Sequence, residues 1–116
     1  MSAGNYDFTI EQGATFARSF VWKDSTDTVI NLTGYTARLQ IRPYKNSTEK
    51  LLEATTANGK LVIAAELGKI TLTFTPTETD TIDFSEGVYD LELVASNGVV
   101  TRLLEGAVTF SRQVTR

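Results

Sequence analysis

Three hydrogen-bonding side chains stand at every second position of one short segment. They are Arg38, Gln40 and Arg42, and the positions between them are apolar. In a β-strand successive side chains point to opposite faces, so these three would form one polar row. A guanidinium presents several donors in a rigid fork that suits carboxylates, and arginine is enriched at protein interfaces. The row is therefore either a solvated sheet face or a surface that docks an acidic region of another protein.

Two groups of carboxylates suggest acid–base chemistry or calcium binding. The groups are Glu78, Asp80, Asp83 and Glu86 in one segment, and Asp24 and Asp27 in another. Neither spacing matches the calcium loop of an EF-hand, and no nucleophile accompanies either group. Short acidic side chains also bond to their own backbone in turns. We therefore expect solvated turns at both places and no metal site.

The chain contains no histidine and no cysteine. The first absence removes the most common general base and transition-metal ligand. The second removes disulfides and thiolate chemistry. The glycines are spread one per turn, so none of them builds a phosphate-binding loop. These features predict a protein that is not an enzyme and that uses no cofactor.

Three aromatic residues share one face of an early segment: Phe16, Phe20 and Trp22. Exposed, such a row would suit stacking against a sugar; inward, it would belong to a core between sheets, which we favour. Arg18 lies on the same face, so we expect this strand to be partly uncovered or Arg18 to reach to an edge. For Tyr89 we expect a buried ring whose hydroxyl satisfies a backbone group, rather than a ligand contact.

A two-residue period dominates the chain and predicts β-strands separated by polar turns. The expected strands cover residues 6–10, 14–22, 35–42, 51–56, 60–65, 69–75, 88–95 and 99–112. Asn58-Gly59 and Asn97-Gly98 predict hairpin turns, because both residue types tolerate positive φ. Gly106 predicts a β-bulge in the last strand.

One short helical turn is expected over 76–82, after a capping-box pattern at Thr75, Pro76 and Glu78. The inward rows of the strands should form the core. These rows are Tyr35, Ala37, Leu39 and Ile41; Ile70, Leu72 and Phe74; Tyr89, Leu91, Leu93 and Ala95; and Leu104, Val108 and Phe110.

Length and composition fit a single domain over residues 1–116. The regular strand spacing predicts an all-β fold, an antiparallel immunoglobulin-like sandwich of about seven or eight strands. The net charge of −3 argues against nucleic acid or an anionic membrane as a partner. No apolar run approaches the roughly 20 residues of a membrane span, and no secretory signal is visible.

Four phrases follow one another along almost the whole chain: "QGATFARSFVWKD" (12–24), "INLTGYTARLQIRP" (30–43), "GKITLTFTPTETDTI" (68–82) and "GVYDLELVASNGVVTRLLEGAVTFSR" (87–112). Together they resemble a family of small virion proteins encoded by tailed bacteriophages and prophages. More loosely, they resemble the immunoglobulin-like N-terminal domain of phage baseplate proteins that anchor receptor-binding proteins. The resemblance implies a structural protein of the tail, baseplate or tail-fibre attachment region. It also implies several copies in each virion and assembly in the bacterial host cytoplasm.

Two alternatives stay open at this point. One is a capsid decoration or head–tail joining protein, which differs from a tail component in its copy number per particle. The other is a carbohydrate-binding module, which requires Phe16, Phe20 and Trp22 to be exposed. Under the virion interpretation the partners are other virion proteins, and Arg38, Gln40 and Arg42 are the candidate interface residues.

Overall fold

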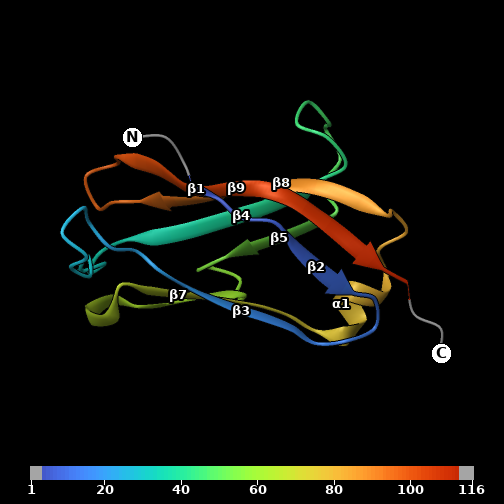
Figure 1. Cartoon of the computed structure of the whole chain (residues 1–116), viewed down its shortest axis with the longest axis horizontal. Coiled ribbons are helices and arrows are strands. Elements are labelled where there is room, and N and C mark those ends of the chain that lie inside the picture. The colour runs from blue at the N-terminus through green and yellow to red at the C-terminus, as the bar shows by residue number, and fades with distance from the viewer. Residues whose placement is uncertain (1–3, 113–116) are drawn as a thin grey trace.

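The computed structural model describes residues 4–112, and these are mostly β-strand (Figure 1). The strands are β1 (Gly4–Asn5), β2 (Phe8–Glu11), β3 (Phe16–Val21), β4 (Thr36–Arg42), β5 (Leu52–Thr55), β6 (Leu61–Ala64), β7 (Lys69–Phe74), β8 (Glu86–Val94) and β9 (Val100–Ser111). A 3-10 helix, η1 (Ala65–Leu67), precedes β7, and a short α-helix, α1 (Pro76–Asp80), follows it. The all-β prediction is confirmed. Within the described range, no helix is long and apolar enough to cross a membrane.

The strands form two sheets that lie one above the other (Figure 1). A six-stranded sheet has the order β1–β9–β8–β4–β5, with β2 also paired to β9, and a three-stranded sheet has the order β3–β7–β6. Most pairs are antiparallel as predicted, but β1 and β2 run parallel to β9. Parallel neighbours need a long connection. Here almost the whole chain lies between the two, so local sequence could not reveal the pairing.

The expected hairpin at Asn58-Gly59 is wrong. β5 pairs with β4 in one sheet, whereas β6 pairs with β7 in the other, so this turn carries the chain between sheets. The local turn chemistry is nevertheless as expected. The Asn58 Oδ1 atom accepts bonds from the backbone N–H of Thr55 and Lys60, and Gly59 has a φ of 80°. A tight turn sets the local chain reversal but not the sheet that the next strand joins.

The core lies between the two sheets and takes the inward rows of both. Its fully buried members include Ile10, Leu39, Ile41, Leu61, Ile70, Leu72, Phe74, Leu91, Leu93 and Val108. Burying one such side chain contributes about 1.5–3 kcal/mol. The predicted rows are confirmed except at their ends, where Tyr35, Ala95 and Leu104 are only partly buried.

The predicted capping box is present at α1. The Thr75 Oγ1 atom accepts from the Glu78 N–H, and Glu78 accepts from the Thr75 N–H at 2.9 Å. The helix ends at Asp80, earlier than the expected residue 82. The buried Thr79 hydroxyl donates to the Ala14 carbonyl, which ties α1 to the turn between β2 and β3.

The bulge in β9 lies at Leu103 and not at Gly106. Leu91 pairs with Leu104 and Glu92 pairs with Arg102, so Leu103 is the extra residue. Gly106 has another role, since a Cβ there would collide with the Tyr6 carbonyl oxygen. Its missing side chain lets the N-terminal segment pass close beside β9.

Candidate functional site

The predicted polar row lies on the outer face of the six-stranded sheet. Arg38, Gln40 and Arg42 all belong to β4, whose alternate residues are buried beneath them. β4 is an inner strand between β8 and β5, so the row runs along the sheet and not along its edge. The predicted geometry is therefore confirmed. The docking role of these three residues stays a prediction.

Neighbouring groups already engage the donors of this row. The contacts are Arg38 Nε to Glu92 Oε1 at 2.8 Å, Gln40 Nε2 to Glu53 Oε2 at 2.7 Å, Arg42 Nη2 to Gln40 Oε1 at 2.7 Å and Arg42 Nη1 to the Ser47 carbonyl at 2.9 Å. The row is thus held in place by its surroundings. An acidic partner would have to compete with these internal acceptors.

Strand register produces this network. Arg38 stands opposite Glu92 of β8, and Gln40 stands opposite Glu53 of β5. A facing cross-strand pair of opposite charge, such as Arg38 and Glu92, contributes roughly 0.2–1 kcal/mol. The sequence places each row on a face but does not say which strand lies alongside, so these partners were not predicted.

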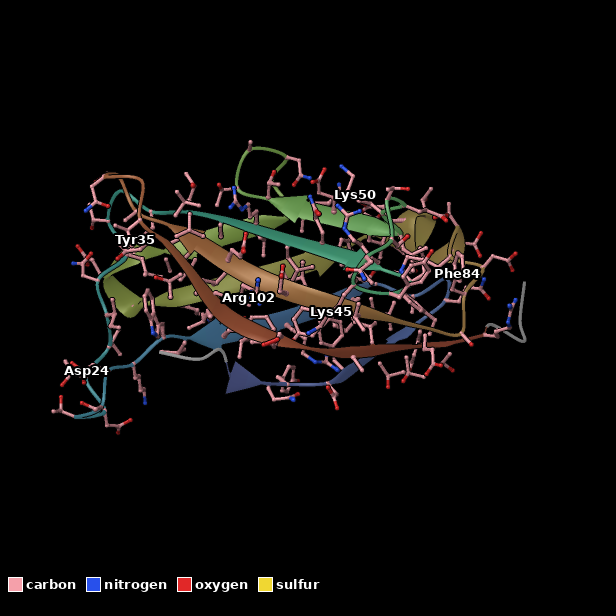
Figure 2. The ribbon with its side chains drawn as sticks, turned by 90° about the horizontal axis from the view of Figure 1, so that it is seen from above. Asp24, Tyr35, Lys45, Lys50, Phe84 and Arg102 are labelled. Carbon is pink, nitrogen blue, oxygen red and sulfur yellow. The ribbon has the colours of Figure 1, made fainter. Side chains whose placement is uncertain are left out.

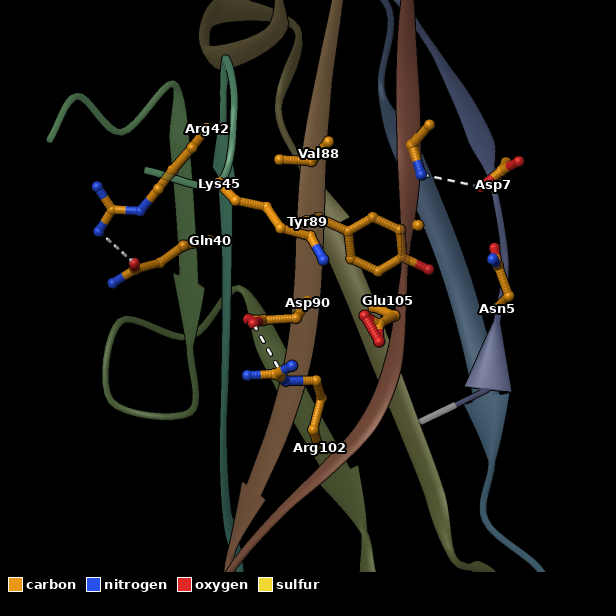
Figure 3. Close-up of a pocket in the computed structure, with 12 residues that line it drawn as sticks. Asn5, Asp7, Gln40, Arg42, Lys45, Val88, Tyr89, Asp90, Arg102 and Glu105 are labelled. Atoms are coloured by element: carbon orange, nitrogen blue, oxygen red, sulfur yellow. Dashed lines mark hydrogen bonds and ion pairs between the residues drawn. The ribbon is translucent and has the colours of Figure 1, made fainter. Parts of the chain in front are cut away.

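A cavity of about 490 Å³ opens on this face over β4, β8 and β9 (Figure 3). Its charged lining residues are Asp7, Arg42, Lys45, Asp90, Arg102 and Glu105. Figure 2 looks down on this face, with Lys45, Lys50 and Arg102 over the sheet and Asp24 and Phe84 toward opposite ends of the molecule. Lys45 extends from the β4 side toward β8 (Figure 3). Within residues 4–112, the side chains of Lys45 and Glu105 have no hydrogen-bond or ion-pair partner, so both can pair with an incoming group.

Asp90 lies at the centre of the cavity floor. It stands opposite Glu105 of β9 and pairs with Arg102 at 3.5 Å (Figure 3). Its partial burial, followed by the neighbouring carboxylate of Glu92, raises the pKa of Asp90, and Arg102 opposes that rise. Lys45, Asp90 and Glu105 are the residues that sequence reasoning missed. Only the alternation of β8 pointed to one of them, by placing Asp90 outward.

Tyr89 ties the N-terminal strand to this side of the molecule. Its ring is buried, and its hydroxyl donates to the Tyr6 carbonyl, as predicted for a core tyrosine. Burial raises the pKa of Tyr89 well above its ordinary value. The Asp7 Oδ1 atom accepts from the Ala107 N–H at 2.8 Å, which fixes the same segment at the rim of the cavity.

Most carboxylates of the two groups are engaged by neighbouring groups. Glu78 caps α1 and pairs with Lys60 at 2.9 Å, and Asp83 pairs with Arg112 at 3.4 Å. Asp24 accepts bonds from the Thr26 hydroxyl and from two backbone N–H groups, and the hydroxyl bond is the main cause of its lowered pKa. In the described part of the chain, no three His, Cys, Asp or Glu residues group closely enough to hold a metal ion.

The aromatic row does not form an exposed platform. Phe16 is buried, and Phe20 and Trp22 are partly buried against the core. Trp22 meets Tyr35 edge-on, with ring centroids 6.1 Å apart. Arg18 is exposed on the same side, with its guanidinium 4.8 Å from the centre of the Phe16 ring. This burial removes the feature on which a sugar-binding role depended.

Fold and site together define a small all-β domain with a charged, internally paired outer face. No protein-family model matches this chain, and a search of curated proteins finds no match. Its function is therefore inferred from its own residues and from the resemblance that the four phrases carry.

Proposed function

We propose that this chain is a non-enzymatic structural protein of a bacteriophage virion. It attaches in the tail, baseplate or tail-fibre region through protein–protein contacts. The observation that carries the proposal is the outer face of the six-stranded sheet, where charged groups of both signs hold one another in fixed positions. A pre-arranged face loses little side-chain freedom on binding and selects its partner by charge pattern.

We further propose that the fold is an immunoglobulin-like sandwich, and the strand order supports this. That fold places strands B, E and D in one sheet and C, F and G in the other. β3, β7 and β6 match the first set, and β4, β8 and β9 match the second, with β5 as an added strand beside β4. One feature departs from that fold. Immunoglobulin-like sandwiches often carry a tyrosine near the start of strand F whose hydroxyl bonds to the backbone a few residues upstream. Here the Tyr89 hydroxyl bonds instead to Tyr6, 83 positions earlier in the chain.

The centre of docking lies at the cavity rather than at the arginine row. Lys45 and Glu105 can each pair with an incoming group without breaking an existing contact. Arg38 and Arg42 are engaged already, so they set the charge pattern around the cavity. Many copies on one particle would let individually weak contacts of this kind add up.

Quantitative mass spectrometry of purified particles of the encoding phage tests the proposal. We expect the chain at a fixed ratio to other virion proteins. A ring-like count of about six to eighteen copies indicates a tail or connector position, whereas hundreds indicate capsid decoration. Particles that lack the chain would contradict the virion role.

A matched pair of charge reversals tests the docking face. Arg38→Glu with Arg42→Glu should lower incorporation into particles, and loss of the Arg38–Glu92 pair should cost less than about 1 kcal/mol of folding stability. The control, Arg18→Glu with Lys23→Glu, makes the same change in net charge at exposed positions of β3 and the turn that follows it. Equal incorporation of both double variants would rule out a docking role for Arg38 and Arg42.

A further inference from the structure

The edge strand β6 leaves backbone groups without hydrogen-bond partners. β6 is the last strand of its sheet and pairs only with β7. The Thr73 N–H donates to the Lys60 carbonyl at 2.9 Å, so the backbone groups of Lys60 point toward β7. Because backbone groups along a strand alternate in direction, Val62 faces β7 whereas Leu61 and Ile63 face away. Within residues 4–112, nothing bonds to the N–H and C=O groups of Leu61 and Ile63.

Side chains obstruct two of the other sheet edges. At β5, the Asn58 amide donates to the Glu53 carbonyl at 3.2 Å and accepts from the Thr55 N–H at 2.9 Å. At β3, the Arg18 guanidinium donates to the Ala17 carbonyl at 3.0 Å. An incoming strand would have to displace these groups. A charged side chain on the inward row of an edge strand is also a known barrier to strand pairing.

The edge formed by β1 and β2 is unsuited to self-pairing for a different reason. Asp7 lies two residues before Thr9 on this edge, and Glu11 lies two residues after it. Two copies pairing antiparallel about Thr9 would place Asp7 of one opposite Glu11 of the other, and facing like charges destabilise a sheet. The segment Leu61–Ala64 carries no charge, and among residues 4–112 no side chain hydrogen-bonds to its backbone.

We propose that two copies of this chain associate through β6, antiparallel about a two-fold axis at Val62. Leu61 of each copy exchanges both backbone hydrogen bonds with Ile63 of the other, so all the free groups are satisfied. The two three-stranded sheets become one continuous six-stranded sheet. This is an isologous contact, in which the same surface serves both subunits. The inference does not depend on the virion role.

The side chains of this edge fit the same register. Val62 is 60 % exposed on the outer face and would meet Val62 of the second copy. Lys60 would lie opposite Ala64 of the second copy and not opposite its own counterpart, so no like charges face each other. Thr71 and Ala64 beside Val62 are small and uncharged, which keeps that outer face open to the second subunit.

Sedimentation velocity from about 1 µM to about 1 mM tests the association over the range expected for a weak contact. The mass should rise from the 12.7 kDa of one chain toward twice that value. Val62→Lys places like charges at the two-fold axis and should abolish the rise. Val99→Lys is the control, because Val99 is 57 % exposed at the tip of the β8–β9 hairpin. A wild-type chain that stays at 12.7 kDa throughout, or a Val62→Lys variant that pairs like wild type, overturns the proposal.

Cysteine cross-linking provides an independent test, because the chain has no cysteine of its own. In the proposed register the two Val62 positions form a non-hydrogen-bonded pair with Cα atoms about 4.5 Å apart, within disulfide reach. A Val62→Cys variant should therefore form an inter-chain disulfide at least tenfold faster than a Val99→Cys variant. Similar rates for the two variants would place the contact elsewhere. Circular dichroism of each variant checks that the fold is kept.

Discussion

The two sheets share one core but present different outer faces. The face of the six-stranded sheet carries charges of both signs in cross-strand contacts, such as Arg38 with Glu92 and Asp90 with Arg102. The outer face of the three-stranded sheet is built almost entirely from small or uncharged residues. The uncharged ones are Ala17, Ser19, Val21, Val62, Ala64, Thr71 and Thr73. Among the outward-facing residues of β3, β6 and β7, Lys69 carries a charge. Its side chains interact through contacts such as the 3.1 Å hydroxyl bond between Ser19 and Thr71.

This difference separates two ways of binding. In the proposed role, the charged face would select a partner by its pattern of donors and acceptors, because neighbours hold most of its groups in place. The neutral face has no such pattern, and its binding potential lies in the unpaired backbone at its β6 edge. We therefore propose contact with a different protein for the first sheet and self-association for the second.

The largest expected effects come from the core beneath each face. Leu39 under the charged face and Leu72 under the neutral face are both fully buried. Leu39→Ala and Leu72→Ala should each lower the free energy of unfolding by about 2–5 kcal/mol, measured by urea denaturation. Similar losses with one cooperative transition indicate a single shared core. A separate early transition in either variant would show that the sheets unfold as independent units.

Loss of the hydrogen bond from Tyr89 to Tyr6 should lower stability by a smaller amount, and its structural effect should be confined to the six-stranded sheet. Tyr89→Phe keeps the buried ring but leaves the Tyr6 carbonyl without its donor. We expect a loss of about 1–2 kcal/mol and faster amide hydrogen exchange in β1 and β2. Tyr44→Phe, at a 63 % exposed position, is the control and should change neither. Faster exchange in β6 and β7 instead would show that this hydrogen bond stabilises the neutral sheet.

The features that the sequence predicted well are local ones. Alternation placed Leu39, Leu72 and Leu91 in the core, and the capping pattern at Thr75 located α1. Each follows from the period of one strand or from bonds between residues a few positions apart.

The features that were missed depend on residues far apart in the chain. The Tyr89 hydroxyl finds its acceptor 83 positions away, and Asn58-Gly59 turns as expected but leads to the other sheet. Glu105 and Asp90 share a cavity only because of the register between β8 and β9. The polar row on β4 was predicted from its own strand, whereas the partners that engage it belong to β5 and β8.

The smallest expected change in stability tests whether attraction or repulsion dominates at Asp90, on the face of the six-stranded sheet. Folding raises the pKa of Asp90, so the folded state binds a proton there more readily than the unfolded state. The ionised carboxylate therefore lowers stability above the raised pKa, and this penalty disappears as the pH falls through it. Asp90→Asn should be more stable than wild type at neutral pH, by less than about 1 kcal/mol because the side chain is 40 % exposed. Urea denaturation should show that the difference shrinks in acid.

Glu53→Gln is the matched control with the opposite sign. The hydrogen bond from Gln40, followed by that from Lys50, lowers the pKa of Glu53, so its stabilisation is present above the unfolded pKa. That stabilisation is lost as the pH falls through the lowered folded pKa. The Glu53→Gln variant should therefore be less stable than wild type at neutral pH, and equal to it in strong acid. If Asp90→Asn instead behaves like Glu53→Gln, the pair with Arg102 outweighs both the burial of Asp90 and the repulsion from Glu92 and Glu105, and the Asp90 carboxylate is held by net attraction.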